Sequence, residues 1–197
     1  MFSCVIFDFG NVLARFDTEQ LTEGFGLCRE DRDLIKKAVF DRKYWDLLDL
    51  GKIDDDACME MYKEQLPPRL YEVADRVYQS WATSLPQIPG MEELCRALKE
   101  KGVRLYLLSD ISKCFARTHA HYPVLSLFDG LVFSAEEGRM KPDEELFRTV
   151  LNRYHIPASE AAFVDDRQAN VDGAERVGIT GILFDGDVEK LSRRLLD

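Results

Sequence analysis

Four short apolar segments of this sequence are each followed by side chains that could take part in chemistry. In order along the chain these side chains are Asp8, Ser109 with Asp110, Lys141, and Asp165 with Asp166. If the apolar segments are parallel strands of one sheet, their ends lie on one edge, where open α/β folds bind their ligands. The spacing therefore predicts a crevice that gathers carboxylates, a hydroxyl and an ammonium group.

This set of groups suits phosphoryl transfer. Asp8 and Asp166 offer the hard oxygen ligands that a divalent cation such as Mg²⁺ requires. Asp8 can also attack phosphorus and form an aspartyl-phosphate, which water then hydrolyses. Ser109 can donate a hydrogen bond to a phosphoryl oxygen, while Lys141 can neutralise developing charge and hold Asp8 ionised.

Each group also has a plain structural explanation. Asp8 could cap the turn that follows it, and Asp165 with Asp166 could be turn residues before a helix. Ser109 could be the N-cap of a helix, and Lys141 could be a solvated loop lysine. Because all the groups follow apolar segments in a regular order, coincidence is the weaker explanation.

The apolar patterns that would position these groups alternate between strands and helices. The expected strands are residues 3–8, 103–108, 130–134, 161–164 and 181–184. The expected helices after the first strand end are residues 91–98, 112–121, 146–154, 168–177 and 188–196. Strands that alternate with helices are typical of an α/β fold with a doubly wound parallel sheet, here a Rossmann-like core.

A long segment after the first strand does not follow this alternation, since it contains helical patterns but no convincing strand. Its clearest apolar stripe has helical spacing and consists of Leu70, Val73, Ala74, Val77 and Trp81. An inserted helical cap explains such a segment. We therefore expect a core domain of residues 1–15 and 86–197 and a helical cap domain of residues 16–85.

The composition excludes several classes of protein. The 197 residues are 46% hydrophobic and 31% charged, which fits a globular protein with one domain or one domain carrying an insertion. The net charge is −10 with acidic residues spread along the chain, so we expect no nucleic-acid partner. The apolar runs are too short for a membrane span, and the N-terminus lacks a signal-peptide pattern.

The cysteines indicate a reducing compartment. There are five of them, an odd number, and no CxxC pair occurs. A disulfide framework or a zinc site is therefore not expected. Together with the absence of a membrane segment, this predicts a cytoplasmic protein.

Four motifs link the chain to a known family. They are Phe7-Asp8-Phe9-Gly10-Asn11-Val12, Leu107-Leu108-Ser109-Asp110, Lys141-Pro142, and Val164-Asp165-Asp166 with Asn170 four residues on. In these motifs the chain resembles the haloacid dehalogenase (HAD) superfamily of phosphohydrolases over essentially its whole length. Within it, the chain is most similar to the branch of bacterial α-D-glucose-1-phosphate phosphatase and the N-terminal phosphatase domain of soluble epoxide hydrolase.

The resemblance implies a role for each motif residue. The implied metal ligands are Asp8, the carbonyl group of Gly10, and Asp166, with Asp165 and Asn170 as neighbours that orient the metal site. Asp8 is also the implied nucleophile. The implied substrate-binding residues are Ser109, Lys141, Asp110 and Asn11, and Lys141 also assists catalysis.

Two positions depart from the family pattern. Most phosphatases of the superfamily carry a second Asp two residues after the nucleophile as general acid and base, and this chain has Gly10 there. The second motif usually continues with Asn, and this chain has Asp110. One hypothesis is that Asp110 has a raised pKa beside phosphate and partly replaces the missing acid. The alternative is that Asp110 caps the following helix through backbone amides.

Candidate specificity residues lie in the cap. They are Phe16, Arg42, Tyr44 and Trp45. Arg42 could bind a second anion or be a surface charge, and Trp45 could be a substrate platform or part of the cap core.

The sequence thus predicts a Mg²⁺-dependent phosphatase that hydrolyses a small phosphate monoester through an aspartyl-phosphate, with a sugar phosphate as one candidate substrate. A 2-haloacid dehalogenase is an alternative, but it needs no metal and has no use for the acids at 165 and 166. A non-catalytic phosphate-binding regulator is a second alternative, supported mainly by Gly10. The expected partner is a small phosphorylated metabolite, and the expected oligomeric state is a monomer or weak homodimer.

Overall fold

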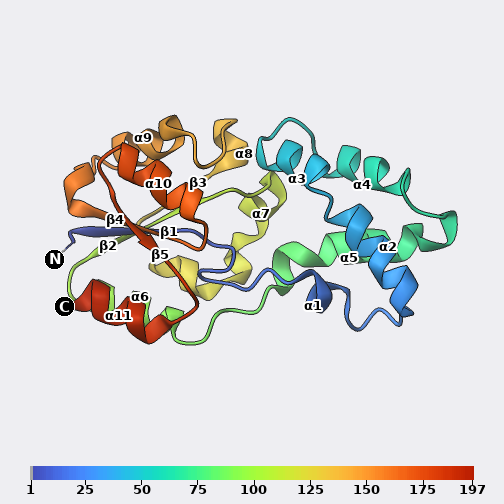
Figure 1. Ribbon diagram of the computed structural model, residues 1–197, viewed down its shortest axis with the longest axis horizontal. Coiled ribbons are helices and arrows are strands. Elements are labelled where there is room, and N and C mark those ends of the chain that lie inside the picture. Colours follow the sequence, from blue (N-terminus) through green and yellow to red (C-terminus); the bar gives the residue numbers. More distant parts are fainter. Residues whose placement is uncertain (1) are drawn as a thin grey trace.

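The computed structural model describes residues 2–197, as a five-stranded sheet with a group of helices at one end (Figure 1). The strands are β1 (Cys4–Phe7), β2 (Arg104–Ser109), β3 (Gly130–Phe133), β4 (Ala161–Asp165) and β5 (Thr180–Leu183). All neighbouring strands are parallel, in the order β3-β2-β1-β4-β5. The predicted doubly wound α/β sheet is confirmed.

The central position of β1 brings distant parts of the chain to one edge of the sheet. Phe7 is in register with Leu107 of β2 on one side and with Val164 of β4 on the other. The backbone N–H of Asp8 extends this pairing by donating to the carbonyl oxygen of Val164, at 2.9 Å. The side chains that follow β1, β2 and β4 therefore leave the sheet at the same edge.

Helices cover both faces of the sheet (Figure 1). One face carries α8 (Ser134–Glu137), α9 (Glu144–Arg153) and α10 (Gln168–Arg176), and the other carries α6 (Met91–Glu100) and α11 (Val188–Leu196). The alternation of a strand explains the two layers, because Cys4 and Ile6 belong to one apolar cluster while Val5 and Phe7 belong to the other. Both faces of β1 are fully buried, as the apolar run predicts.

The remaining core elements connect these layers. They are α7 (Lys113–Thr118) and the 3-10 turns His119–His121, Pro123–Leu127 and Ala158–Glu160. In the described residues 2–197 all five cysteines are free thiols, and no helix is both long and apolar enough to cross a bilayer.

The helices before residue 85 form the second lobe of the molecule (Figure 1). They are α1 (Thr18–Thr22), α2 (Arg29–Val39), α3 (Arg42–Asp49), α4 (Asp55–Lys63), the 3-10 turn Pro68–Leu70 and α5 (Tyr71–Ser84). The apolar stripe predicted for α5 is buried, from Val73 to Trp81. We keep the proposed division and call residues 16–85 the cap and the other residues the core.

The end of α3 is fastened to the core. The hydroxyl of Ser134 in α8 donates to the backbone carbonyl of Asp49 at 2.6 Å, and it accepts from the backbone N–H of Ile111 at 2.8 Å. The next turn is equally close, because a Cβ added to Gly51 would lie 2.1 Å from the carbonyl oxygen of Ala135. Gly51 also has a φ of +64°, a conformation that favours glycine. These contacts fix where the cap residue Asp49 stands relative to the core.

Candidate active site

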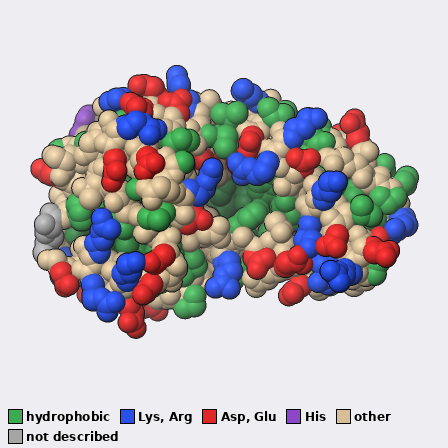
Figure 2. All heavy atoms as spheres, in the orientation of Figure 1, with side chains coloured by type: hydrophobic (Ala, Val, Ile, Leu, Met, Phe, Trp, Pro, Cys, Tyr) green, Lys and Arg blue, Asp and Glu red, His purple; other side chains and the backbone are tan. Residues whose placement is uncertain are grey.

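A cavity of about 160 Å³ lies between the cap and the carboxyl edge of the sheet. In the space-filling view the surface is hollowed between the two lobes, with hydrophobic side chains inside the hollow and Lys or Arg side chains near its rim (Figure 2). The core contributes Asp8, Phe9, Gly10, Asn11, Ser109, Asp110, Ile111, Asp166, Arg167 and Asn170 to its lining, and the cap contributes Phe16, Arg42, Trp45, Asp49, Trp81 and Leu85. The predicted crevice at the strand ends therefore exists.

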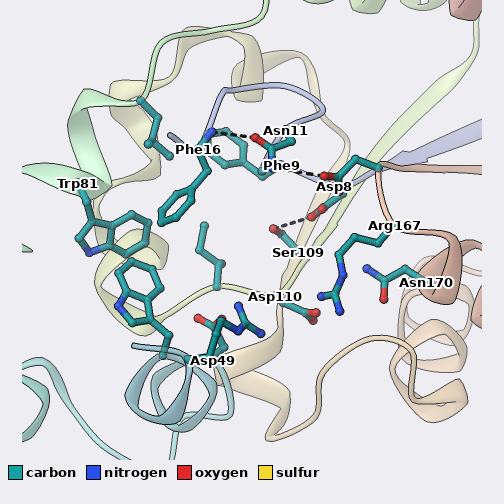
Figure 3. Close-up of a pocket in the computed structure, with 16 residues that line it drawn as sticks. Asp8, Phe9, Asn11, Phe16, Asp49, Trp81, Ser109, Asp110, Arg167 and Asn170 are labelled. Carbon is teal, nitrogen blue, oxygen red and sulfur yellow. Dashed lines mark hydrogen bonds between the residues drawn. The ribbon is translucent and has the colours of Figure 1, made fainter. Parts of the chain in front are cut away.

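Asp8 stands directly after β1 and is only 8% exposed. Its Oδ1 accepts hydrogen bonds from the hydroxyl of Ser109, at 2.9 Å, and from the ammonium group of Lys141, at 2.8 Å (Figure 3 shows the first). Burial raises the pKa of Asp8 to about 7, although the positive charge of Lys141 acts in the opposite direction. Asp8 is thus a buried carboxylate held by two donors rather than a residue that caps a turn.

Lys141 is the buried cation of this site, with 4% of its surface exposed. Its Nζ lies 2.8 Å from Asp8 Oδ1 and 2.8 Å from Asp165 Oδ2. Burial alone would lower the pKa of Lys141, but the surrounding carboxylates outweigh this and hold its pKa above the usual value. The structure therefore excludes a solvated loop lysine and gives Lys141 a fixed place beside Asp8.

Asp165 is fully buried and its two oxygens are occupied by protein donors. Besides Lys141, the backbone N–H of Arg167 donates to Oδ1 at 2.8 Å, and the amide of Asn170 lies 3.0 and 3.1 Å from the two oxygens. Asp165 therefore positions Lys141 and the start of α10.

Asp166 is half-buried and lines the cavity beside Asp8. Burial and the charge of Asp165 raise its pKa. The amide nitrogen of Asn11 donates to Asp166 Oδ2 at 3.3 Å, and the amide oxygen of Asn11 accepts from the backbone N–H of Phe16 at 3.0 Å. Asn11 has a φ of +55° and so completes the tight turn after β1. The structure places Asn11 at the cavity with both ends of its amide engaged.

The carboxylates offer a place for a divalent cation. One oxygen each of Asp8, Asp165 and Asp166 lies within 4.8 Å of the others. Carboxylate oxygens are the hard ligands that Mg²⁺ prefers, and a dication would offset the burial and the neighbouring charge of Asp165 that together raise the pKa of Asp166. The residues present therefore fit such an ion.

Asp110 does not cap the following helix. Its Oδ1 accepts from the backbone N–H of Lys141 at 2.9 Å, so it fastens the loop that carries the lysine. The N-cap of α7 is Ser112, which makes no side-chain cap hydrogen bond. Burial raises the pKa of Asp110, and its Oδ2 is buried without a hydrogen-bond partner in the described part of the chain.

Gly10 leaves free space at the position where the family usually has its second Asp. A Cβ added to Gly10 would meet no atom within 4 Å. The cavity wall is therefore open at this point, and no neighbouring side chain takes up the space next to the backbone.

Aromatic rings form the cap side of the cavity. The ring centroid of Trp45 lies 5.4 Å from the ring centroid of Phe16 and 4.9 Å from that of Trp81, and both pairs are edge-to-face. Trp45 is anchored by its indole N–H, which donates to the carbonyl oxygen of Val39 at 2.6 Å. The indole nitrogen of Trp81 is buried without a partner among residues 2–197.

The four cap residues predicted to set specificity divide into two groups. Phe16, Trp45 and Arg42 line the cavity. Arg42 is exposed and pairs with Asp46 at 2.6 Å, as a surface charge would. Tyr44 does not line the cavity, and its hydroxyl accepts from the amide of Gln65 at 2.8 Å. The prediction for Tyr44 is wrong because the residue falls one position before Trp45, on a different side of α3.

Sequence reasoning missed six residues of the lining, which are Phe9, Asp49, Trp81, Leu85, Ile111 and Arg167. Asp49 is 4% exposed and lies on the buried side of α3 with Trp45 and Leu48. A carboxylate at helical spacing on an apolar stripe is a signal that the sequence did contain. Trp81 was part of the α5 stripe, which predicts burial but not that the ring faces a cavity.

Comparisons with known proteins place this geometry in context. A family model described as haloacid dehalogenase-like hydrolase matches residues 2–178. The chain is 31% identical over 186 residues to the sesquiterpene phosphatase astK of Aspergillus oryzae, an alignment that covers 92% of this chain and 89% of astK. It is 25% identical over 193 residues to a D-ribitol-5-phosphate phosphatase of Bacteroides thetaiotaomicron, covering 90% of this chain and 89% of that enzyme.

Solved structures share the fold. A HAD family enzyme from Bacteroides thetaiotaomicron, crystallised in complex with magnesium and inorganic phosphate, superposes with a TM-score of 0.76 at 21% identity. The match covers 97% of this chain and 99% of that protein, so both the sheet and the helical lobe have counterparts.

Proposed function

The chain belongs to the haloacid dehalogenase-like hydrolases, and from this premise we propose that it is a Mg²⁺-dependent phosphatase that hydrolyses a small phosphate monoester through an aspartyl-phosphate on Asp8. One observation carries the proposal. The buried carboxylate of Asp8 lines one cavity with the hydroxyl of Ser109 and the carboxylate of Asp166, and it is paired with the buried ammonium group of Lys141 behind the cavity wall. Each of these groups has a use in phosphoryl transfer, as nucleophile, as positive charge, as hydrogen-bond donor or as metal ligand.

The residues that would hold Mg²⁺ are Asp8, Asp166 and the backbone carbonyl of Gly10. Asp165 and Asn170 would orient the site, since the amide of Asn170 donates to Asp165 and Asp165 also accepts from the ammonium group of Lys141. When bound, the ion would supply positive charge that lets an anionic nucleophile approach an anionic phosphate.

The first half of the reaction forms a bond from a carboxylate oxygen of Asp8 to phosphorus. The bond between phosphorus and the ester oxygen breaks, and its electron pair leaves with that oxygen, which takes up a proton. Lys141 lies 2.8 Å from Asp8, which favours the ionised nucleophile and offsets charge on the phosphoryl group. The hydroxyl of Ser109, also bonded to Asp8, can rotate to donate to a phosphoryl oxygen.

The second half of the reaction hydrolyses the aspartyl-phosphate and regenerates free Asp8. A water molecule loses a proton and its oxygen bonds to phosphorus, the bond from phosphorus to Asp8 breaks, and inorganic phosphate leaves. The same positive groups support both halves, because the charge on the phosphoryl oxygens is the same in each.

Asp166 favours the phosphatase over the dehalogenase alternative. A dehalogenase also uses a nucleophilic Asp but needs no metal. Asp165 has a positioning task in either reaction, since it holds Lys141. Asp166 instead lines the cavity, within 4.8 Å of an oxygen of Asp8, where a metal-free reaction at carbon has no task for it.

For the organic group of the substrate, the cap lining favours an apolar structure. Phe16, Trp45 and Trp81 present aromatic rings to the cavity, with Leu85 beside them. The similar astK is a sesquiterpene phosphatase, which fits such a wall, whereas the similar enzyme from Bacteroides acts on D-ribitol 5-phosphate. We propose a phosphate ester of an apolar alcohol as the substrate class, with the sugar phosphate as the alternative.

The test begins with hydrolysis of p-nitrophenyl phosphate with and without Mg²⁺. We expect metal-dependent turnover that Asp8→Asn abolishes while the protein stays folded by circular dichroism. Release of halide from a 2-haloacid without metal would support the dehalogenase instead. Phosphate binding by calorimetry with no turnover would support the regulator.

A substrate panel then separates the two substrate classes. It pairs prenyl and aryl phosphates with sugar and polyol phosphates, each measured as kcat/KM. A higher value for the apolar esters supports the proposal, and a higher value for the sugar esters overturns it. The narrower branch resemblance and the monomer or weak homodimer stay predictions, which the same panel and a sedimentation experiment address.

A further inference from the structure

The proposed reaction needs a proton donor that Gly10 cannot be. An alkoxide leaving group is a poor one, so its oxygen must be protonated as the bond to phosphorus breaks. The donor has to be an acid that reaches the leaving oxygen and that keeps its proton at neutral pH. Gly10 has no side chain, and Ser109 and Lys141 are bonded to the nucleophile.

The position of the leaving oxygen follows from the geometry of phosphoryl transfer. The attacking oxygen, phosphorus and leaving oxygen lie roughly in line. Because Asp8 attacks from the edge of the core sheet, the leaving oxygen points away from the sheet, into the part of the cavity that the cap lines. With Gly10 lacking a side chain on the core loop, a cap residue that lines this part of the cavity can supply the acid.

Asp49 is the carboxyl group at that place. It belongs to α3 of the cap and lines the same cavity as Asp8, and Figure 3 shows it beside a cap helix, apart from Asp8 and Ser109, with Asp110 as the nearest labelled residue in this view. The residue is 96% buried, and in the described residues 2–197 its Oδ1 has no hydrogen-bond partner. A buried carboxyl oxygen without a partner is costly unless it is neutral or meets a ligand.

We propose that Asp49 is the general acid that protonates the leaving oxygen and the general base that later deprotonates the attacking water. This inference rests on the proposed phosphatase function and names the residue that takes the task of the missing second Asp. It assigns a catalytic role to the cap rather than to the loop after β1.

Asp49 gives one proton in the first half of the reaction and takes one back in the second half. In the first half its carboxylic acid gives its proton to the ester oxygen, which departs as an alcohol, and Asp49 becomes a carboxylate. In the second half that carboxylate takes a proton from water as the water oxygen bonds to phosphorus. Asp49 is then protonated again, Asp8 is free, and no further reactant is needed.

The surroundings of Asp49 suit an acid that holds its proton. Burial raises its pKa to about 8, and the charge of Asp110 acts in the same direction. Asp46 and Asp8 add to this effect, and the exposed Arg42 opposes it. From α4, the titratable group that faces Asp49 is the buried thiol of Cys58. A neutral carboxyl group is thus the form that the cavity favours before substrate binds.

The backbone holds Asp49 in place. Its carbonyl oxygen accepts from Ser134 of the core at 2.6 Å, so the backbone that carries the carboxyl group is fastened to the core. Asp110, the other acid considered from the sequence, has one oxygen bonded to the backbone of Lys141. That bond gives Asp110 a positioning task on the core side of the cavity.

The dependence of kcat/KM on the leaving group tests the proposal. This constant reports the step in which the alcohol leaves, whatever the rate of the later hydrolysis. A series of phosphate monoesters from nitrophenyl through phenyl to alkyl esters spans good to poor leaving groups. We expect a shallow dependence for the wild type and a steep one for Asp49→Asn, with a loss of about 10²- to 10⁴-fold for alkyl esters and a small loss for nitrophenyl phosphate.

Two matched variants make the result specific. Asp110→Asn makes the same change of carboxylate to amide in the same cavity and keeps an acceptor for the Lys141 N–H. We expect its leaving-group dependence to run parallel to that of the wild type, whatever its overall rate. Asp56→Asn, an exposed residue on α4, should leave both the rate and the dependence unchanged.

A rescue experiment adds a gain of function. A Cβ at Gly10 meets no atom within 4 Å, so the backbone at that position has room for a side chain to begin. In the Asp49→Asn protein we expect Gly10→Asp to restore part of the rate for alkyl esters. The proposal is overturned if the leaving-group dependence of kcat/KM in Asp49→Asn is as shallow as in the wild type. It is also overturned if this dependence becomes steep in Asp110→Asn. Absence of metal-dependent turnover in the wild type would overturn the proposed function instead, and this outcome is visible before any variant is made.

Discussion

Replacement of Asp49 by Asn should make the protein more stable, and the gain should grow with pH. The folded protein raises the pKa of Asp49 from its ordinary 3.8 to about 8, chiefly through burial. The folded state therefore favours the protonated acid. The stability that this preference contributes is complete below about pH 4 and is lost as the pH rises through about 8. Asn keeps the size and polarity of the neutral acid and cannot ionise.

The magnitude follows from the two pKa values. One pKa unit corresponds to about 1.4 kcal/mol, so the two proteins should differ little near pH 4 and by roughly 4 kcal/mol at about pH 7. This is an upper figure, since the chain around Asp49 can rearrange when the group ionises. A domain has a total stability of about 5–15 kcal/mol, so such a difference is large enough to measure.

Urea unfolding at about pH 5 and about pH 8, followed by circular dichroism, provides the measurement. We expect the free energy of unfolding of the wild type to fall more steeply between these pH values than that of Asp49→Asn. The exposed Asp56→Asn variant should follow the wild type. If Asp49→Asn is destabilised at both pH values, the ionised carboxylate makes a favourable contact in the fold, and the reasoning about a neutral buried acid is refuted.

Further predictions concern the cation, the cap contact, the aromatic wall and the metal. Lys141→Met leaves the carboxylates of Asp8 and Asp165 buried without a cation, so urea unfolding should show a loss of about 3–5 kcal/mol; a loss below about 1 kcal/mol would contradict this. Gly51→Ala places a Cβ 2.1 Å from the Ala135 carbonyl oxygen at a φ of +64°, so the free energy of unfolding measured with urea should fall by about 1–3 kcal/mol; Gly24→Ala, with a positive φ but open space, should lower it less. Trp81→Ala removes a buried ring and should cost about 3–5 kcal/mol in unfolding; an unchanged preference for apolar esters would argue against its place in the substrate wall. Chelation of divalent cations should abolish turnover without a change in circular dichroism, and added Mg²⁺ should restore it; turnover that persists in chelator would refute the metal requirement.

The sheet could be predicted from the sequence because its strands are short and apolar, and the central strands β1, β2 and β4 are buried on both faces. The run before Asp8 shows this, since Val5 and Phe7 pack on one face while Cys4 and Ile6 pack on the other. The end of each apolar run shows where the strand ends. The polar residues that follow it therefore lie at the carboxyl edge of the sheet. Ser109 and Lys141 could be placed beside Asp8 for this reason.

The cap side of the cavity could not be predicted in the same way. Its geometry depends on how two lobes meet, and this is decided by contacts between residues far apart in the sequence, such as Ser134 with the carbonyl group of Asp49. An apolar stripe identifies the buried side of α3 but not whether that side faces the cap interior or the cavity. Tyr44 and Trp45 are neighbours in the sequence, and only Trp45 lines the cavity.

Asp110 illustrates a second limit. A carboxylate before a helix is a good N-cap by local rules, and its bond to the backbone of Lys141 involves a loop 31 residues away. The local signal was therefore outweighed by a tertiary contact. The same contact explains why a carboxylate can stand in this cavity, since the backbone N–H takes up one of its oxygens.

The location of the proposed acid has a consequence for how this site would operate. An acid on the loop after β1 is next to the nucleophile whatever the cap does. Asp49 stands on α3, so nucleophile and acid meet because the cap is fastened to the core, and the contacts nearest to Asp49 are those at Ser134 and Gly51. A weakened contact at either point should therefore slow departure of poor leaving groups more than good ones, even though neither residue touches the phosphate. Gly51→Ala would then resemble Asp49→Asn in its leaving-group dependence, and Gly10→Asp would correct both, because an acid at position 10 does not depend on the cap.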